Sequence, residues 1–147
     1  MGQIKTKRNK AYRPRQVHIP VMPDLQRDFL FAGHGALAAL RLAPNVHALD
    51  QLAAMFNVIL VALVDTGRAS IILESGMRAL QEVANRFERT GAVAIGRYEL
   101  APIELALVEC ENLIKQLDVM GLYIAQKRLR AAEAMERLEA ARSKVAA

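Results

Sequence analysis

The sequence lacks tryptophan and has only one cysteine, three serines and seven aromatic residues among its 147 residues. The single cysteine, Cys110, excludes an internal disulfide framework and any metal cluster that needs several cysteines. Because strands are rich in aromatic residues, their scarcity argues against a β-sandwich. Apolar residues make up 53% of the chain, with alanine and leucine prominent, and this composition favours helices. We therefore expect an all-α protein with one domain.

Long apolar segments are also lacking. The longest runs from Val58 to Val64, seven residues, whereas a helix needs about 20 to span a bilayer. No apolar stretch follows the basic N-terminus, as it would in a secretory signal. We therefore expect a soluble, intracellular protein that does not associate with membranes.

Patterns that carry catalysis are missing as well. His18, His34 and His47 have no spacing typical of a metal site, and the glycines do not form a phosphate-binding loop. Five acids are expected on the solvated face of one late helix, with Glu111 paired to Lys115 one turn later. These acids are Glu99, Glu104, Glu109, Glu111 and Asp118. We expect no catalytic residue, no metal, no cofactor and no enzymatic activity.

Positive charge is concentrated at the N-terminus. Residues 1–23 carry six basic side chains and no acid, a charge of +6, while the rest of the chain carries −1. Three prolines favour an extended arm here, with apolar residues after position 16 suited to a strap on the domain surface. Six cations and one interleaved tyrosine suit phosphate contacts and base stacking, or an acidic protein surface. These candidate binding residues are Lys5, Lys7, Arg8, Lys10, Tyr12, Arg13 and Arg15.

Apolar periodicity predicts a four-helix bundle behind this arm. The first three helices are expected at 24–42, 45–65 and 70–89, with Asp24 and Asn45 as N-caps. Residues 91–98 have no helical pattern and suit a loop or a short strand. The domain plan is therefore an extended basic arm at 1–23, a helical bundle at 24–126 and a charged helical extension at 127–147.

The fourth helix is expected to be unusually long. An apolar seam steps by three and four from Ile103 to Ile124, and neither glycine nor proline other than Gly121 interrupts the segment from Pro102 to Ser143. Such a helix outruns the bundle, so it projects, bends at Gly121 or packs on another subunit. We favour self-association, with a homodimer as the default, over a solvated charged helix. The candidate self-association residues are Ile124, Ala131, Met135 and Leu138.

Five short motifs suggest a family. They are Lys10-Ala11-Tyr12-Arg13-Pro14-Arg15; His34 to Leu40; Leu52 and Asn57 in a helix ending at Thr66-Gly67; Ala79-Leu80 with Arg86 and Arg89-Thr90-Gly91; and Glu99-Leu100 with Gln116-Leu117-Asp118. In these motifs the sequence resembles, to about Arg130, a family of short uncharacterised helical proteins from proteobacterial phages, prophages and plasmids. It departs from many members in having Ala48-Leu49-Asp50 where they carry a tryptophan. The resemblance implies a mobile-element origin and the cytoplasm of a bacterial host cell, and it brings no catalytic residues.

Two functions are compatible with these features. The first is a non-enzymatic accessory protein of a phage or mobile element that binds nucleic acid through its arm. As an oligomer, it would grip one polyanion with several arms. The alternative is a protein–protein inhibitor or modulator of a host defence or transcription machine, whose partner is an acidic host protein.

Overall fold

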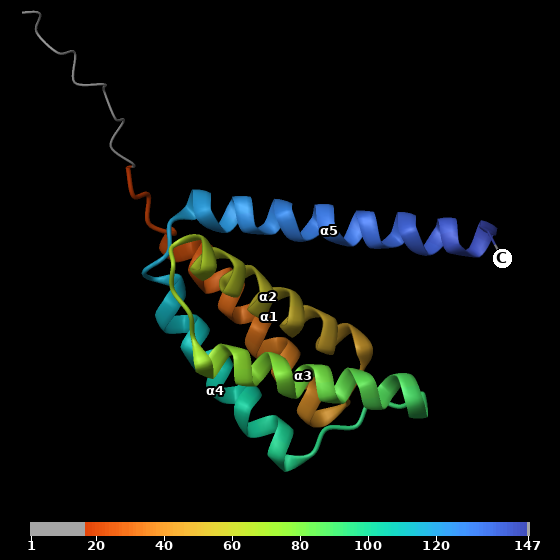
Figure 1. Ribbon diagram of the computed structural model, residues 1–147. Helices are drawn as coiled ribbons and strands as arrows, with labels where there is room; N and C mark the ends of the chain where they lie inside the picture. The colour runs from red at the N-terminus through yellow and green to blue at the C-terminus, as the bar shows by residue number, and fades with distance from the viewer. Residues whose placement is uncertain (1–16, 147) are drawn as a thin grey trace, which may run out of the picture.

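The computed structural model describes residues 17–146, which form five α-helices joined by short loops (Figure 1). The all-α prediction is confirmed for this part of the chain. The helices are α1 (Pro23–Leu42), α2 (Val46–Asp65), α3 (Ile71–Thr90), α4 (Arg97–Ile114) and α5 (Val119–Ala146). The expected count of four helices is wrong, because the predicted long helix is divided into α4 and α5.

The starts of α2 and α3 follow from polar capping residues in the sequence. The Asn45 side chain accepts a hydrogen bond from the N–H of Ala48 at 2.9 Å. The Ser70 hydroxyl accepts one from the N–H of Leu73 at 3.3 Å. Each cap satisfies a backbone donor that has no partner inside its helix. Both predicted starts are therefore confirmed.

Glycines close the same two helices. Gly67 and Gly91 both have φ of +71°, a backbone conformation that side chains disfavour. After Gly91 the chain runs as a loop to α4 without forming a strand. The predicted cap of α1 is wrong, since that helix begins at Pro23 and places Asp24 in its first turn. A carboxylate there still faces the positive end of the helix dipole.

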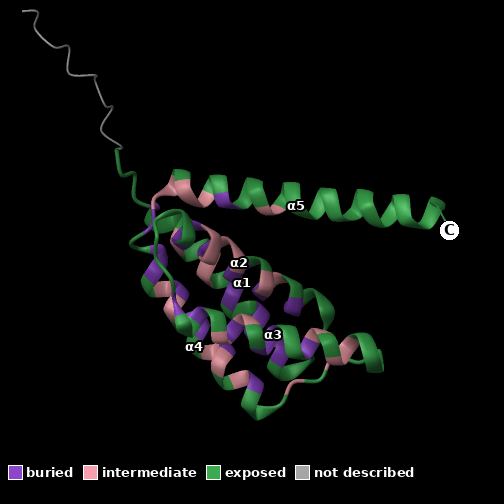
Figure 2. Ribbon diagram, viewed as in Figure 1, coloured by how far each residue is buried: buried purple, intermediate pink, exposed green. Residues whose placement is uncertain are grey.

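The α2 helix lies at the centre of the fold and contacts each of the other four helices. Its residues Leu52, Phe56 and Ile59 are completely buried. Within residues 17–146, α2 is the one helix long and apolar enough to cross a membrane by length and composition alone. Its position among four other helices is that of a core helix (Figure 2).

Close packing between α3 and α4 depends on a small residue. A Cβ atom added to Gly76 would lie 2.3 Å from the Cβ of Ala106, far inside normal contact distance. On α1, a Cβ added to Gly33 would lie 2.5 Å from the Cε of Met55 and 2.8 Å from the Cδ1 of Leu107, which are the ends of flexible side chains. Gly35 has open space around it. Of these two α1 glycines, only Gly33 lies against other helices.

The predicted continuous helix from Pro102 to Ser143 is wrong. The α4 helix ends at Ile114, the chain turns through residues 115–118, and α5 then runs across α2 (Figure 1). The turn does not occur at Gly121, which lies in the first turn of α5. Asp118, the last residue of the turn, makes a tertiary contact that is described below.

The second half of α5 extends beyond the other helices. Among the helices, α5 contacts only α2, and Ala125 is its only buried residue within 119–146. Residues 130–146 are all exposed, as the colouring of α5 in Figure 2 shows. The projecting segment therefore begins a few residues after the predicted boundary at position 127.

Candidate functional site at the root of the basic arm

Residues 17–22, which we call the arm root, are tied to the turn between α4 and α5. The backbone N–H of Ile19 donates to Oδ2 of Asp118 at 2.6 Å, and the N–H of Val119 donates to the Ile19 carbonyl at 2.9 Å. Val21 is 2% exposed and packs into the core. This short antiparallel contact ties the arm root to the turn before α5 (Figure 1).

The carboxylate of Asp118 organises this junction. It also accepts hydrogen bonds from the N–H groups of Met120 at 2.7 Å and Gly121 at 3.3 Å, and so caps the start of α5. His18 lies 3.7 Å from the same carboxylate. The hydrogen bond from Ile19, followed by those from the α5 N-terminus, holds the pKa of Asp118 below its ordinary value. Each of these donors favours the ionised carboxylate.

A second set of polar contacts braces the same end of the molecule. Arg68, after α2, donates to the side-chain oxygen of Gln116 at 2.9 Å. Arg128 of α5 forms an ion pair with Asp65 at the end of α2. These contacts hold the turn before α5 and the first half of α5 against the end of α2.

All seven residues predicted to bind a polyanion lie outside the described residues. They are Lys5, Lys7, Arg8, Lys10, Tyr12, Arg13 and Arg15. The last of them precedes Ile19 by four positions in the sequence. The structure therefore describes the attachment point of the candidate binding segment, and binding by that segment stays a prediction.

The predicted strap of apolar residues against the domain surface is confirmed in part. Val21 is buried, and its carbonyl accepts a hydrogen bond from the Gln26 side chain at 2.7 Å. The neighbouring apolar residues Val17, Ile19 and Met22 are exposed to 75%, 49% and 69%. The segment is thus fastened through one apolar side chain and its backbone.

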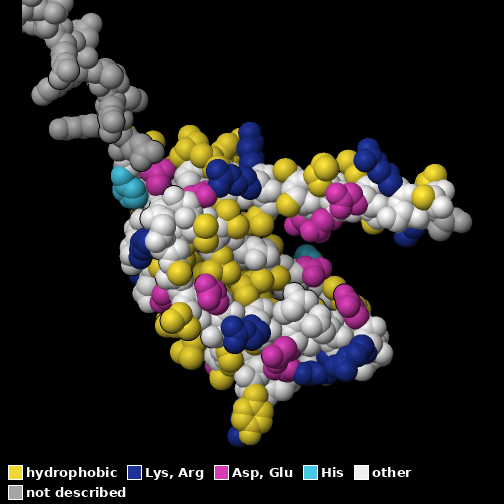
Figure 3. Space-filling view, in the orientation of Figure 1, with side chains coloured by type: hydrophobic (Ala, Val, Ile, Leu, Met, Phe, Trp, Pro, Cys, Tyr) yellow, Lys and Arg dark blue, Asp and Glu magenta, His cyan; other side chains and the backbone are white. Residues whose placement is uncertain are grey.

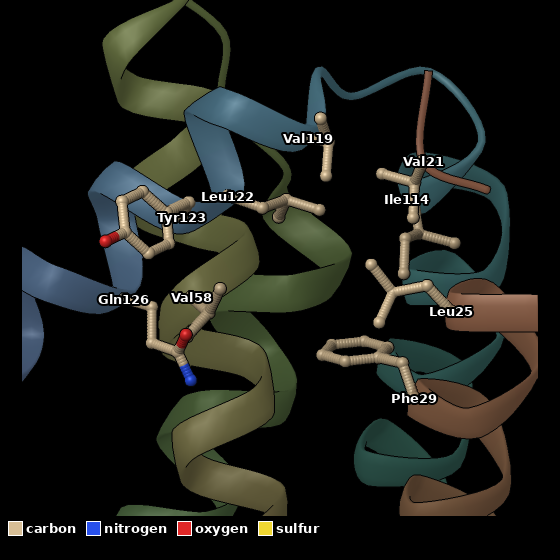
Figure 4. A pocket seen from close by; sticks show the side chains of 9 residues that line it. All are labelled: Val21, Leu25, Phe29, Val58, Ile114, Val119, Leu122, Tyr123 and Gln126. Atoms are coloured by element: carbon tan, nitrogen blue, oxygen red, sulfur yellow. The ribbon is translucent and has the colours of Figure 1, made fainter. Parts of the chain in front are cut away.

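An apolar cavity of about 280 Å³ opens beside the arm root, between α1, α2 and α5 (Figure 4). Phe29 of α1 and Tyr123 of α5 approach it from opposite sides, and Val21 of the arm root forms part of its wall. The Nζ of Lys127 lies 4.8 Å from the centre of the Tyr123 ring. Apart from the amide of Gln126 and the Tyr123 hydroxyl, the lining side chains are hydrocarbon. The cavity suits an apolar or planar group and offers no acid–base pair.

The predicted self-association residues lie on exposed parts of α5. Side chains of Ile124, Met135 and Leu138 are 40%, 57% and 55% exposed, and Ala131 is also exposed. Apolar patches interrupt the charged residues along the projecting helix in Figure 3. The structure thus leaves these residues accessible, and self-association through them stays a prediction.

The three histidines have different surroundings and do not form one site. His18 faces Asp118, His34 of α1 bonds to Glu111 of α4 at 2.5 Å, and His47 is exposed in the first turn of α2. Residues 17–146 hold no group of three or more His, Cys, Asp or Glu side chains arranged to bind a metal. Cys110 is completely buried, as expected of a small apolar residue, and burial raises the pKa of its thiol to about 12.

The prediction of one solvated acidic face is wrong for several of its members. Glu104 forms an ion pair with Arg41 of α1, and Glu109 accepts a hydrogen bond from Ser70. Glu111 bonds to His34 in place of the expected Lys115. These carboxylates bind partners outside their own helix. Spacing along a single helix does not reveal such contacts.

Glu99 departs furthest from that prediction, because it is only 7% exposed. It forms an ion pair with Arg86 of α3 and accepts a hydrogen bond from the N–H of Gly96 at 2.8 Å. The hydrogen bond from Arg86 is the main reason that the pKa of Glu99 is lowered. Arg86 also donates to the Ala94 carbonyl at 3.0 Å, so this pair fixes the loop before α4.

The sequence analysis placed Asp118 and Glu99 among the solvated acids and missed the structural contacts that both residues make. Asp118 precedes the run Val119-Met120-Gly121, and aspartate is a preferred N-cap, so a new helix start was detectable there. Glu99 lies three residues after Gly96, the spacing of a capping box. Their tertiary partners are Ile19 and Arg86, and no pattern in the neighbouring sequence indicates these pairings.

Comparison with known proteins does not assign this chain to a family. No family model, no curated protein and no solved structure matches this chain. The resemblance to phage and plasmid proteins therefore stays a prediction.

Proposed function

We propose that this chain is a non-enzymatic accessory protein of a phage or other mobile element that binds nucleic acid in the bacterial cytoplasm. Its working unit is a helical bundle with an extended basic arm. The observation that carries the proposal is the arm root, where Ile19 is bonded to Asp118 and Val21 is buried. A segment with six cations is thereby attached to a folded domain at one defined point.

The distribution of charge supports this assignment. The arm carries +6 in residues 5–15, whereas everything after residue 23 carries −1. Attraction to a polyanion is therefore expected from the arm and not from the helical domain as a whole. Phosphate contacts by lysine and arginine release counterions, which gives strong, salt-sensitive binding without base specificity.

We further propose that the protein binds as an oligomer. Ile124, Ala131, Met135 and Leu138 are accessible on α5, where a second copy can cover them. A dimer would present two arms to one strand, and the second arm would bind at a high effective concentration. Modest contacts by each arm would then combine into useful affinity.

The first test is fluorescence anisotropy with labelled single- and double-stranded DNA and RNA at low salt. We compare the full chain with a variant that lacks residues 1–15, which leaves the arm root intact. The proposal predicts binding by the full chain and a large loss in the shortened variant. Equal binding by both proteins would refute the role of the arm.

A matched pair of triple variants separates the arm from charge in general. Lys7→Ala, Arg8→Ala and Lys10→Ala remove three cations from the arm, and Arg137→Ala, Arg142→Ala and Lys144→Ala remove three exposed cations from α5. We expect a much larger loss of affinity for the arm variant. Equal losses would show that only net charge matters.

Inhibition of a host machine is the competing outcome of these tests. If the full chain does not bind nucleic acid at low salt, it is used as bait in a nuclease-treated host lysate. Recovery of one acidic host protein in fixed stoichiometry, dependent on residues 1–15, would replace the nucleic-acid proposal.

A further inference from the structure

The turn between α4 and α5 lacks the residues that normally end a helix. Residues 115–118 are Lys-Gln-Leu-Asp, with neither glycine nor proline. Lys115 keeps right-handed helical angles, with φ of −69° and ψ of −20°. Lysine, glutamine and leucine are good helix formers. Local sequence therefore favours continuation of α4 into α5, and something else must hold the turn.

The contacts that hold the turn come from elsewhere in the chain. Asp118 is bonded to the N–H of Ile19, 99 positions earlier, and the N–H of Val119 is bonded to the Ile19 carbonyl. Asp118 also caps α5 through Met120. The bend is thus stabilised by the arm root and by one carboxylate, and weakening these contacts favours a straight helix.

A straight helix would keep its apolar face. Ile114, Leu117 and Gly121 follow one another at spacings of three and four, so the seam of α4 passes through the turn into α5 without a break in register. Leu117 is 3% exposed in the present bend. In a straight helix it would need a new apolar neighbour, and a second copy can supply one.

The surface that α5 covers belongs to one helix only. Ala125 is completely buried against the domain, and Arg128 pairs with Asp65 of α2. If the turn straightens, α5 leaves its own α2 exposed. The α5 helix of a second copy has the complementary shape and charge for that surface, because it is the same helix.

We infer that the face of α2 beneath α5 is an interface for a second copy of this chain, formed by exchange of α5 after residues 115–118 straighten. Short connections invite such exchange, because each copy regains the contacts it gave up. The arm root restrains the exchange by holding the bend. The inference deepens the oligomeric part of the proposed function and does not depend on nucleic-acid binding.

The test uses the ion pair between Asp65 and Arg128. In D65R two arginines face each other within one chain, and in R128D two aspartates do so. Exchange of α5 between these two variants places one arginine against one aspartate at both α2–α5 contacts, so both repulsions are relieved. We expect native mass spectrometry of a co-refolded mixture to show several-fold more heterodimer than random pairing gives.

Two further variants make that result unambiguous. The double variant D65R/R128D restores an opposite pair within one chain and is expected to behave as the wild type does. D118A removes the carboxylate that holds the bend, so it should increase the dimer fraction in size-exclusion chromatography with light scattering.

A proline variant tests the straight helix itself. V119P places proline at the first position of α5, where the bend tolerates it and a continuous helix does not. The change also removes the hydrogen bond from the Val119 N–H to Ile19, and a weaker bend alone would increase exchange. Abolished dimers in V119P would therefore be due to the block on the straight helix. This comparison applies even if a charge-reversed chain fails to fold.

Each outcome decides the matter. Excess heterodimer, together with a monomeric V119P, supports exchange. Dimers that pair at random, or a V119P protein that dimerises like the wild type, overturn exchange but leave self-association through exposed α5 residues standing. A wild type that is monomeric at every concentration overturns both, and anisotropy still tests nucleic-acid binding independently.

Discussion

Replacing Gly76 by alanine should destabilise the protein, although the same change inside a helix normally stabilises it. An added Cβ would lie 2.3 Å from the Cβ of Ala106 and 3.2 Å from the carbonyl oxygen of Pro102. Carbon atoms make favourable contact at roughly 3.5–4.0 Å. Since the Ala106 Cβ is fixed to its backbone, neither methyl group can rotate away and α3 must move from α4.

The size of the effect follows from two opposing contributions. Overpacking a dense core costs about 1–3 kcal/mol, and the rigid contact with Ala106 places this case near the upper end. Alanine regains about 1 kcal/mol over glycine through its helix propensity. We therefore expect G76A to lower the free energy of unfolding by ~2 kcal/mol.

Gly35 provides the matched control, because an added Cβ there meets nothing within 4 Å. G35A should raise the free energy of unfolding by about 0.5–1 kcal/mol. The double variant G76A/A106G moves the methyl group from α4 to α3 and should return close to wild-type stability. The effect at position 76 is thereby assigned to one contact.

Thermal unfolding followed by circular dichroism measures these differences. For a chain of this size, the expected gap between G76A and G35A corresponds to about 10 °C in Tm. If G76A unfolds at the same temperature as G35A or above it, the close approach of α3 and α4 is refuted. If A106G fails to rescue G76A, the assigned contact is incorrect.

The remaining predictions concern the core and the ionised groups. Cys110 should not react with a thiol reagent at pH 8 until the protein unfolds, because burial raises the pKa of its thiol to about 12; rapid labelling of the native protein would contradict this. F56A should lower the free energy of unfolding by about 3–5 kcal/mol in urea titrations, since Phe56 is completely buried; a loss below about 1 kcal/mol would contradict its core position. Asp118 and Glu99 have lowered pKa values in the folded protein, so their stabilisation is present above the unfolded pKa values of about 4 and is lost as pH falls through the folded ones. Stability of the wild type should therefore decline below about pH 4, and more steeply than in D118N/E99Q; identical pH profiles would contradict these roles.

The first three helices could be predicted from the sequence because their signals are local. Asn45 and Ser70 provide caps at the helix starts, and Gly67 and Gly91 supply the left-handed conformation at the ends. Apolar periodicity between these signals predicts the helices themselves. Such features need only neighbouring residues, so one sequence contains them.

The division of the last helix could not be predicted from periodicity. Its seam passes through residues 115–118 without a glycine or proline, so the local pattern favours a single helix. At the bend, Asp118 is bonded to Ile19, which lies 99 positions earlier in the sequence. Only the preference of aspartate for N-caps pointed to a new start at that position.

The candidate site was predicted in part. Charge and proline content predict an extended arm whose cations lie outside the described residues, so that part stays a prediction. The apolar residues after position 16 indicated a strap, of which Val21 is the buried member. The point where the arm root is attached depends on the hydrogen bond between Asp118 and the backbone of Ile19. Amino-acid composition does not indicate this pairing. The ion pair of Glu99 was missed for the same reason, since its partner Arg86 belongs to another helix.

The central claim, that the arm binds nucleic acid through phosphate contacts, is tested most directly by the salt dependence of binding. Anisotropy titrations of the full chain with a labelled single strand over a series of salt concentrations give the slope of log K against log salt. If all six cations of the arm contact phosphates, the slope should be about −4 on a single strand and about −5 on a duplex. A slope near zero, or the same slope after removal of residues 1–15, would contradict the account.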